Sequence, residues 1–210
     1  MKLKVCGMKF IENIQQVAEL KPDYLGFIFY EKSPRNFEGI IPELPKGIKK
    51  VGVFVNEYLE IVVSLIEEYQ LETVQLHGDE PVEYIQKLKE YLPKVEIIKV
   101  FGIKDEFNFE VLESYEEVVD YFLFDTKGKE RGGNGVTFNW QALRDYNSTK
   151  PFFLSGGIGL EEVGELQSFL KRKESQYCYA IDVNSKFETK PGVKSVKELK
   201  KFKKSISQNS

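Results

Sequence analysis

The sequence predicts an α/β protein: a single (β/α)8 TIM barrel of the phosphate-binding type, spanning residues 1–210 as one domain. Three observations predict this fold. Short apolar runs alternate with helical patterns along the chain, the runs recur roughly every 20 to 30 residues, and glycine-rich segments follow the later runs. A chain of 210 residues is long enough for such a barrel, and no composition shift or long polar linker divides it.

The apolar runs are expected to be parallel strands, because strands buried on both faces and joined by helical crossovers form near-continuous apolar stretches. We expect these strands at 3–6, 24–29, 50–55, 73–76, 95–100, 121–124, 152–154 and 179–183. Residues spaced as on one helix face predict helices at 11–20, 59–69, 82–91, 111–119, 140–146, 160–170 and 196–206. Residues 33–45 are expected to be a loop with at most one short helix.

An open doubly wound sheet would give the same alternation of strands and helices. Such sheets usually carry a Gly-x-Gly-x-x-Gly loop after the first strand. Here the first strand ends in Cys6-Gly7-Met8-Lys9, and the glycine-rich segments come after the sixth and seventh strands. Phosphate-binding barrels keep their anion site in this late part of the chain, so the barrel is favoured.

Composition excludes several classes of protein. Hydrophobic residues make up 41% of the chain and charged residues 30%, as in ordinary globular proteins. No apolar run approaches the length of a membrane span, and we expect neither a signal peptide nor membrane association. The net charge of −3 and the helical spacing of the lysines in 197–204 argue against nucleic-acid binding. We expect a cytoplasmic protein in which Cys6 and Cys178 are free thiols.

Polar residues gather at the carboxyl ends of the expected strands, where TIM barrels carry their active sites. Alternation along a strand places Cys6 and Lys4 on one face of the first strand, and Asp125 with Leu123 on one face of the sixth. Cys6 and Asp125 can therefore both face the barrel axis, where a thiol and a carboxyl suit general base and general acid catalysis. Taken singly, Cys6 could be a buried core residue and Asp125 a helix cap.

Two further expectations follow from the same alternation. Lys4 and Asp182 point inward on strands that become neighbours when the barrel closes, and we expect them to interact directly or through a water. Cys178 is expected to face the interior near the closed end of the barrel. Catalysis also requires that the pKa of Cys6 be lowered and the pKa of Asp125 be raised.

A phosphate site is expected at two adjacent loops. Ser155-Gly156-Gly157-Ile158-Gly159 follows a strand and precedes the helix expected at Leu160, so backbone N–H groups of Gly156 and Gly157 can approach an anion near the helix N-terminus. Asn184 and Ser185 end the next strand and could supply converging donors. A tight strand-to-helix turn is the alternative interpretation of the glycines.

Two other residues are candidates for binding substrate. Arg35 follows a proline that stiffens its loop, and its planar guanidinium can bind a carboxylate through two hydrogen bonds. His77, the only histidine, lies at a strand-to-helix turn and could contact substrate or hold its own loop; we do not expect it to be the catalytic base. Each could also be a surface or loop residue without a role in binding.

Several short segments, taken in order, resemble one known family. They are Lys4-Val5-Cys6-Gly7-Met8, Gly26-Phe27-Ile28-Phe29-Tyr30 with Lys32-Ser33-Pro34-Arg35, Val51-Gly52-Val53-Phe54-Val55-Asn56, Val74-Gln75-Leu76-His77-Gly78-Asp79-Glu80, Phe124-Asp125-Thr126, Gly132-Gly133-Asn134-Gly135, Thr137-Phe138-Asn139-Trp140, Leu154-Ser155-Gly156-Gly157-Ile158, Asp182-Val183-Asn184-Ser185, Glu188 and Pro191-Gly192-Val193-Lys194. Their order and spacing resemble the phosphoribosylanthranilate isomerases of tryptophan biosynthesis across nearly the whole chain.

The resemblance implies an Amadori rearrangement of N-(5-phosphoribosyl)anthranilate, with Cys6 as general base and Asp125 as general acid. It implies that Arg35 holds the anthranilate carboxylate and that Gly156, Gly157, Asn184 and Ser185 hold the phosphate. His77 and Asp182 are further candidates for contact with substrate. The small-molecule substrate would be bound by a monomer or homodimer without cofactor or metal. The sequence departs from the family pattern at Asn139, Glu31 and Lys186, and a glycine is usual where Lys186 stands in the phosphate loop.

Other phosphate-binding barrels are the nearest alternatives. The histidine-pathway sugar isomerase performs related chemistry with an aspartate where Cys6 stands. Indole-glycerol-phosphate synthase needs a lysine acid and an N-terminal extension. A non-catalytic barrel that binds a phosphorylated metabolite would have the same fold, and fold alone does not exclude it.

Overall fold

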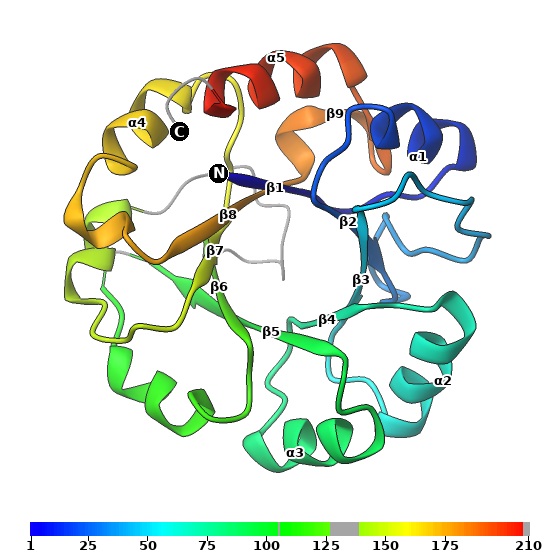
Figure 1. Ribbon diagram of the computed structural model, residues 1–210, viewed down its shortest axis with the longest axis horizontal. Coiled ribbons are helices and arrows are strands. Elements are labelled where there is room, and N and C mark those ends of the chain that lie inside the picture. The colour runs from blue at the N-terminus through cyan, green and yellow to red at the C-terminus, as the bar shows by residue number, and fades with distance from the viewer. Residues whose placement is uncertain (105, 127–138, 208–210) are drawn as a thin grey trace.

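Eight parallel strands close into a barrel in the order β1-β2-β3-β4-β5-β6-β7-β8. In this computed structural model, residues 1–104, 106–126 and 139–207 are described. Figure 1 shows the strands as an inner ring with the helices around it. The predicted TIM barrel is therefore confirmed, whereas the segments Gly132-Gly133-Asn134-Gly135 and Thr137-Phe138 lie outside the described residues.

The elements follow the chain order expected from the sequence. The strands are β1 Lys2–Val5, β2 Tyr24–Ile28, β3 Lys49–Phe54, β4 Thr73–Leu76, β5 Glu96–Ile103, β6 Tyr121–Thr126, β7 Phe152–Leu154 and β8 Cys178–Val183. The α-helices are α1 Ile11–Ala18, α2 Leu59–Tyr69, α3 Val82–Tyr91, α4 Val163–Phe169 and α5 Val196–Ser207. Within the described ranges, each helix is too short or too polar to serve as a membrane span.

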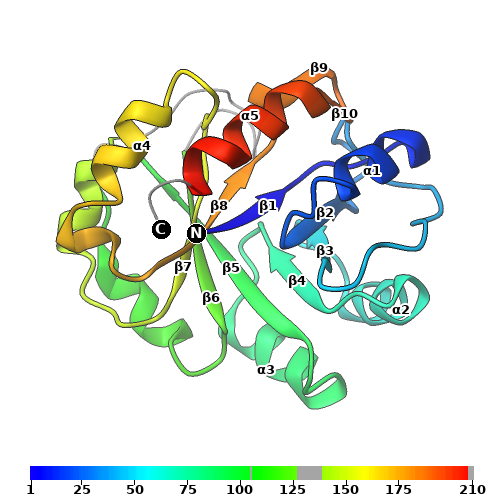
Figure 2. The same cartoon turned by 45° about the horizontal axis from the view of Figure 1, so that its top comes forward.

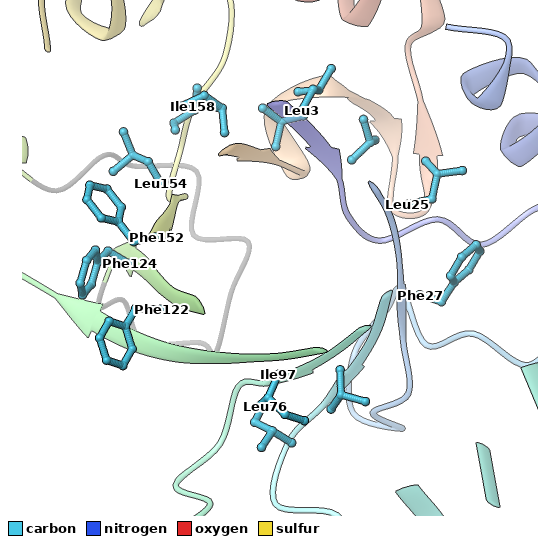
Figure 3. Packing of buried hydrophobic residues seen from close by; sticks show 14 of the residues in the cluster. Leu3, Leu25, Phe27, Leu76, Ile97, Phe122, Phe124, Phe152, Leu154 and Ile158 are labelled. Atoms are coloured by element: carbon cyan, nitrogen blue, oxygen red, sulfur yellow. The ribbon is translucent and has the colours of Figure 1, made fainter. Parts of the chain in front are cut away.

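The strands bury both faces, and each face belongs to a different core. Apolar side chains such as Phe27, Phe122 and Phe152 point away from the barrel axis and pack under the helices (Figure 3). A smaller cluster that includes Val53, Leu123 and the side chain of Cys6 fills the barrel itself. Because both faces are buried, each strand corresponds to a nearly continuous run of apolar residues in the sequence.

Two expected α-helices are instead 3-10 helices, η1 Phe109–Tyr115 and η2 Trp140–Asp145. Their buried residues recur every third position, at Phe109 and Leu112 in η1 and at Trp140 and Leu143 in η2. A spacing of three keeps these side chains on one face of a 3-10 helix, which has three residues per turn. A side-chain oxygen of Asn108 caps η1, and that of Asn139 caps η2.

The expected interior position of Cys178 is wrong. The β7–β8 pairing shifts register, from Phe152 opposite Cys178 to Phe153 opposite Ala180. The irregularity places Cys178 in the outer core, under the helices. The ring of Tyr179 instead stacks on that of Tyr121, with centroids 4.8 Å apart. Strict alternation from Asp182 could not reveal this break.

A hairpin that the sequence did not predict follows β8. After the short 3-10 helix η4, Ser185–Phe187, strand β9, Glu188–Lys190, pairs antiparallel with β10, Val193–Lys194. Figure 2 shows this hairpin beside α1. Asn13 of α1 donates to the carbonyl of Lys194 at 2.9 Å and accepts from its N–H at 2.7 Å. A buried amide therefore joins the first helix to the hairpin.

We predict that Asn13→Ala lowers the free energy of unfolding by about 2–4 kcal/mol, because it leaves both backbone groups of Lys194 buried without their partner. Urea unfolding of the folded variant measures the loss. The control is Gln167→Ala, which removes one half-buried bond to the carbonyl of Ser205 and should cost under about 1 kcal/mol. Equal losses in the two variants would contradict the prediction.

Candidate active site

The site is built around an ion pair that joins the first strand to the last. Lys4 Nζ lies 2.9 Å from Asp182 Oδ1, and both side chains are buried. The two residues are direct partners in the β1–β8 pairing, so the pair lies on the seam that closes the barrel. Ser155 at the end of β7 donates to Asp182 Oδ2 at 3.3 Å. The direct interaction expected between Lys4 and Asp182 is therefore confirmed.

Cys6 follows β1 directly and is buried. A methyl group on Gly26 of β2 would lie 2.9 Å from Cys6 Sγ, so the absence of a side chain there makes room for the thiol. Burial raises the pKa of Cys6, and Asp182 raises it further, while Lys4 and Lys194 lower it. The net shift is upward. The expected lowering of this pKa is wrong, because desolvation outweighs the two cations.

Asp125 is the last buried residue of β6, which is separated from β1 by β7 and β8 in the closed barrel. Burial raises the pKa of its carboxyl to about 7, although the N–H of Thr126 donates to Oδ1 at 2.8 Å and opposes the shift. Asp182 raises this pKa and Lys4 lowers it. The direction agrees with the requirement for a general acid. Since Lys4 and Asp182 act on the pKa of both Cys6 and Asp125, the two groups share one electrostatic environment.

His77 is turned toward Asp125. Its Nε2 lies 3.6 Å from Asp125 Oδ2, and its Nδ1 lies 3.1 Å from the side-chain nitrogen of Gln75. A donor in Gln75 makes Nδ1 the acceptor, so the proton of a neutral imidazole lies on Nε2 and faces the carboxyl. The loop that follows is held by Glu80, which accepts from the N–H of Gly78 and pairs with buried Lys99 at 3.0 Å.

The glycine loop after β7 comes close to Asp125. Gly156 has φ of +92° and Gly157 has φ of +62°, which favour glycine. A methyl group on Gly156 would lie 2.3 Å from the hydroxyl of Thr126 and 3.1 Å from Asp125 Oδ1. The loop therefore needs Gly156 both for its backbone conformation and for its approach to β6.

The helix after this loop starts later than expected, at Val163 instead of Leu160. Glu162 accepts a hydrogen bond from the N–H of Gly159 at 2.8 Å, and Lys186 Nζ lies 3.9 Å from its other oxygen. The glycine loop is thus not the first turn of α4. Lys186 has no positive φ, so the lysine at this position requires no left-handed backbone.

Arg35 and Asn184 are brought together at the same end of the barrel. Arg35 binds Glu188 through Nε and Nη2, and the side-chain oxygen of Asn184 accepts from Lys194 at 2.6 Å. A methyl group on Gly7, whose φ is +72°, would lie 2.6 Å from Asn184 Oδ1 and 2.8 Å from Arg35 Cδ. Gly7 therefore allows both side chains to lie against the backbone next to Cys6.

Sequence reasoning missed the contributions of Gly26, Glu188 and Lys194. Glu188 and Lys194 entered the sequence analysis only within segments that resemble the family, because the β9–β10 hairpin that carries them was not predicted and alternation could not assign their direction. Gly26 carried a clearer signal, since a glycine inside a buried strand often marks a close approach. Within the described ranges, no group of three or more His, Cys, Asp or Glu side chains could hold a metal ion.

Comparison with known proteins identifies the fold and the chemistry. The family model of N-(5'-phosphoribosyl)anthranilate isomerase matches residues 3–205. The curated isomerase of Phocaeicola vulgatus is 42% identical over 194 residues, which cover 92% of each chain. The chain belongs to this family. It converts N-(5'-phosphoribosyl)anthranilate into 1-(o-carboxyphenylamino)-1-deoxyribulose 5-phosphate in tryptophan biosynthesis.

Solved phosphoribosylanthranilate isomerases share the whole barrel. The structure from Thermotoga maritima is 32% identical, has a TM-score of 0.83 and covers 99% of both chains. A further structure of that protein is described as monomers of a dimeric enzyme. A structure of phosphoribosylanthranilate isomerase in complex with reduced 1-(o-carboxyphenylamino)-1-deoxyribulose 5-phosphate is 30% identical, has a TM-score of 0.80 and covers 99% of both chains. The family match decides against the other phosphate-binding barrels.

We predict that Gly26→Ala lowers kcat at least tenfold, because the added methyl displaces Cys6 Sγ and misplacement by about 1 Å can cost 100-fold. Steady-state kinetics on the folded variant measures the effect. Gly164→Ala is the matched control, since a methyl there meets nothing within 4 Å. A Gly26→Ala enzyme with wild-type kcat would show that the thiol does not depend on this space.

Proposed function

We propose that Cys6 is the general base and Asp125 the general acid of the isomerisation. The observation that carries this proposal is that one buried ion pair, Lys4 with Asp182, acts on the pKa of both groups at the same end of the barrel. A carboxyl with a pKa of about 7 still holds a proton near neutral pH, as a general acid must. His77 faces that carboxyl, with Nε2 3.6 Å from Asp125 Oδ2, and contacts the substrate beside it.

The reaction divides into two proton transfers. Asp125 donates its proton to the furanose ring oxygen, the C1–O bond breaks, and the ring opens to a protonated Schiff base. The thiolate of Cys6 then removes the proton from the adjacent sugar carbon, and the electron pair moves to the nitrogen to give an enolamine. The enolamine tautomerises to the ketone. The positive charge of the Schiff base lowers the pKa of Cys6 when it forms, because an opposite charge favours the thiolate.

The two pKa values favour ionisation of Asp125 before Cys6, whereas the reaction needs a protonated Asp125 and an ionised Cys6. The pKa of Cys6 is raised from its ordinary value, while that of Asp125 is about 7. The carboxyl therefore ionises first, and the form with protonated Asp125 and ionised Cys6 is a minor species at every pH. The reaction proceeds through that minor species, which the charge developing on the substrate stabilises.

Substrate binding uses the remaining residues at the same mouth. Arg35 holds the anthranilate carboxylate, and the backbone N–H groups of Gly156 and Gly157 hold the phosphate. Asn184 and Ser185 close the other side of the phosphate loop, and Asp182 lies below the sugar, fixed by Lys4 and Ser155. A related isomerase solved with the reduced product, which carries both a carboxylate and a phosphate, supports this assignment.

We also propose that the chain is a single domain of residues 1–210 and works in the cytoplasm. Free Cys6 and Cys178 suit a reducing compartment. The dimeric state of the Thermotoga maritima enzyme supports a homodimer over a monomer. Sedimentation of the purified chain tests the oligomeric state.

We predict that Cys6→Ala and Asp125→Asn each lower kcat at least about 100-fold with little change in KM, since each removes a proton-transfer group worth ~10²–10⁴ in rate. The fluorescence decrease as phosphoribosylanthranilate is consumed gives both constants. Cys178→Ala is the matched control, because Cys178 is a free thiol in the outer core. Near-normal turnover by either site variant would exclude its assigned role.

We predict that kcat/KM increases as the pH rises through about 7, stays level, and falls only above the raised pKa of Cys6. At low pH both groups are protonated, and loss of one proton near pH 7 gives the singly protonated pair that contains the active species. The pH profile of kcat/KM measures both limbs. Asp125→Asn should abolish the limb near 7; a rising limb near the ordinary pKa of an aspartate would contradict the prediction.

A further inference from the structure

The guanidinium of Arg35 is fixed by a carboxylate far away in the sequence. Nε lies 2.9 Å from Glu188 Oε1 and 3.0 Å from Oε2, and Nη2 lies 2.7 Å from Oε2. The side chain of Glu188 is 5% exposed and that of Arg35 is 13% exposed. The Nε–Nη2 side of the guanidinium faces the carboxylate of Glu188. Because the paired N–H groups have a rigid geometry, this contact holds the guanidinium in one plane.

Glu188 is itself held by the hairpin. Lys194 Nζ lies 2.6 Å from Glu188 Oε1, and the N–H of Gly192 donates to the same oxygen at 3.0 Å. The side chain of Lys194 is fully buried, and its ammonium also donates to the side-chain oxygen of Asn184 at 2.6 Å. Asn13 of α1 fixes the backbone of Lys194. Every group that orients Glu188 therefore belongs to a tightly held part of the fold.

The charges of this cluster do not cancel. Arg35 and Lys194 are basic side chains, and both touch the carboxylate of Glu188. Burial lowers the pKa of Lys194, whereas Glu188 opposes that shift, and with Lys194 protonated the three side chains carry one excess positive charge. Burial opposes ionisation of Glu188, but hydrogen bonds from Arg35 and Lys194 hold its pKa below the ordinary value. An Arg–Glu pair alone would be neutral and would attract a substrate carboxylate weakly, whereas the added lysine restores the attraction.

The guanidinium also keeps a free edge. Arginine has five N–H donors, and Glu188 occupies those on Nε and one side of Nη2. Nη1 makes no hydrogen bond to any part of the chain that the structure describes. The Nη1–Nη2 end of the fork can therefore still bind a carboxylate through two hydrogen bonds. The sequence led us to expect such binding from Arg35 without indicating which edge is used.

We propose that Glu188 is a positioning residue for substrate binding: it turns the Nη1–Nη2 edge of Arg35 toward the substrate carboxylate, and Lys194 supplies the charge that keeps this clamp cationic. The proposal rests on the role of Arg35 given above. It makes the β9–β10 hairpin, which supplies neither the general base nor the general acid, the determinant of selectivity for a substrate with an ortho-carboxylate. Gly7 completes the arrangement by leaving space for Arg35 Cδ and Asn184.

The test compares two ligands by calorimetry. One is reduced 1-(o-carboxyphenylamino)-1-deoxyribulose 5-phosphate, and the other is the same compound without the carboxylate. Glu188→Gln should weaken binding of the first about tenfold, as for loss of one charged hydrogen-bond partner, and should change the second less than about twofold. Glu188→Asp keeps the charge and should recover part of the affinity. Equal effects on the two ligands would overturn the proposal.

A double-mutant cycle shows whether Glu188 acts through Arg35. In an Arg35→Ala background, Glu188→Gln should change binding of the carboxylate ligand less than about twofold, because the group that it positions is gone. A full tenfold loss in that background would overturn the proposal. If Arg35→Ala alone leaves binding of this ligand unchanged, the role of Arg35 fails first. If Arg35→Ala weakens binding and Glu188→Gln does not, only the positioning role fails.

A matched control and a second variant complete the test. Glu96→Gln removes a carboxylate that pairs with Lys49 at 2.6 Å at the opposite end of the barrel, and it should leave both affinities unchanged. Thermal unfolding identifies any variant that is not folded. Where Glu188→Gln does not fold, Lys194→Gln carries the test. Because Lys194 also holds Asn184 of the phosphate loop, it should weaken both ligands but the carboxylate ligand more, and equal weakening of both ligands would overturn the proposal.

Discussion

The buried ion pair between Lys4 and Asp182 is the interaction on which the rest of the site depends. Its two residues lie opposite each other in the β1–β8 pairing, so the contact forms only when the last strand meets the first and the barrel closes. Loss of either partner would leave a buried charge uncompensated, which typically costs about 3–5 kcal/mol. The same pair lies beneath Cys6 and Asp125 and acts on the pKa of both. The contact that closes the barrel therefore also contributes to the electrostatics of the site.

Lys4 and Asp182 shift the pKa of each reacting group in opposite directions. Burial therefore decides which of the two groups are protonated. Desolvation is the largest cause of the raised pKa of Cys6 and of the value of about 7 for Asp125. A dry site favours the neutral forms of both an acid and a base. Asp125 therefore keeps the proton that a general acid donates, whereas ionisation of Cys6 depends on the positive charge of the ring-opened substrate. Such a site suppresses reaction of the thiolate with anything other than the bound intermediate.

Glycines and the hairpin after β8 complete the site by close approach. Glycines at positions 7, 26 and 156 each stand where a methyl group would meet Arg35, Cys6 or Asp125. The hairpin after β8 adds Glu188 and Lys194, and Asn13 ties that hairpin to α1. The strands thus supply the reacting groups, while the glycines and the hairpin determine the distances between them.

The sequence by itself determined the barrel, the order of its strands and the candidate acid and base. Apolar periodicity and alternation depend only on local residue order, and the residues at strand ends could be read directly from it. The interior contact of Lys4 with Asp182 also followed, because both lie on strands that must meet. Only the tertiary structure decided the outer position of Cys178, the 3-10 form of the segments after β5 and β6, the edge on which Glu188 holds Arg35, and the raised pKa of Cys6. Each of these depends on burial or on contacts between residues far apart in the chain, and no local pattern carries that information.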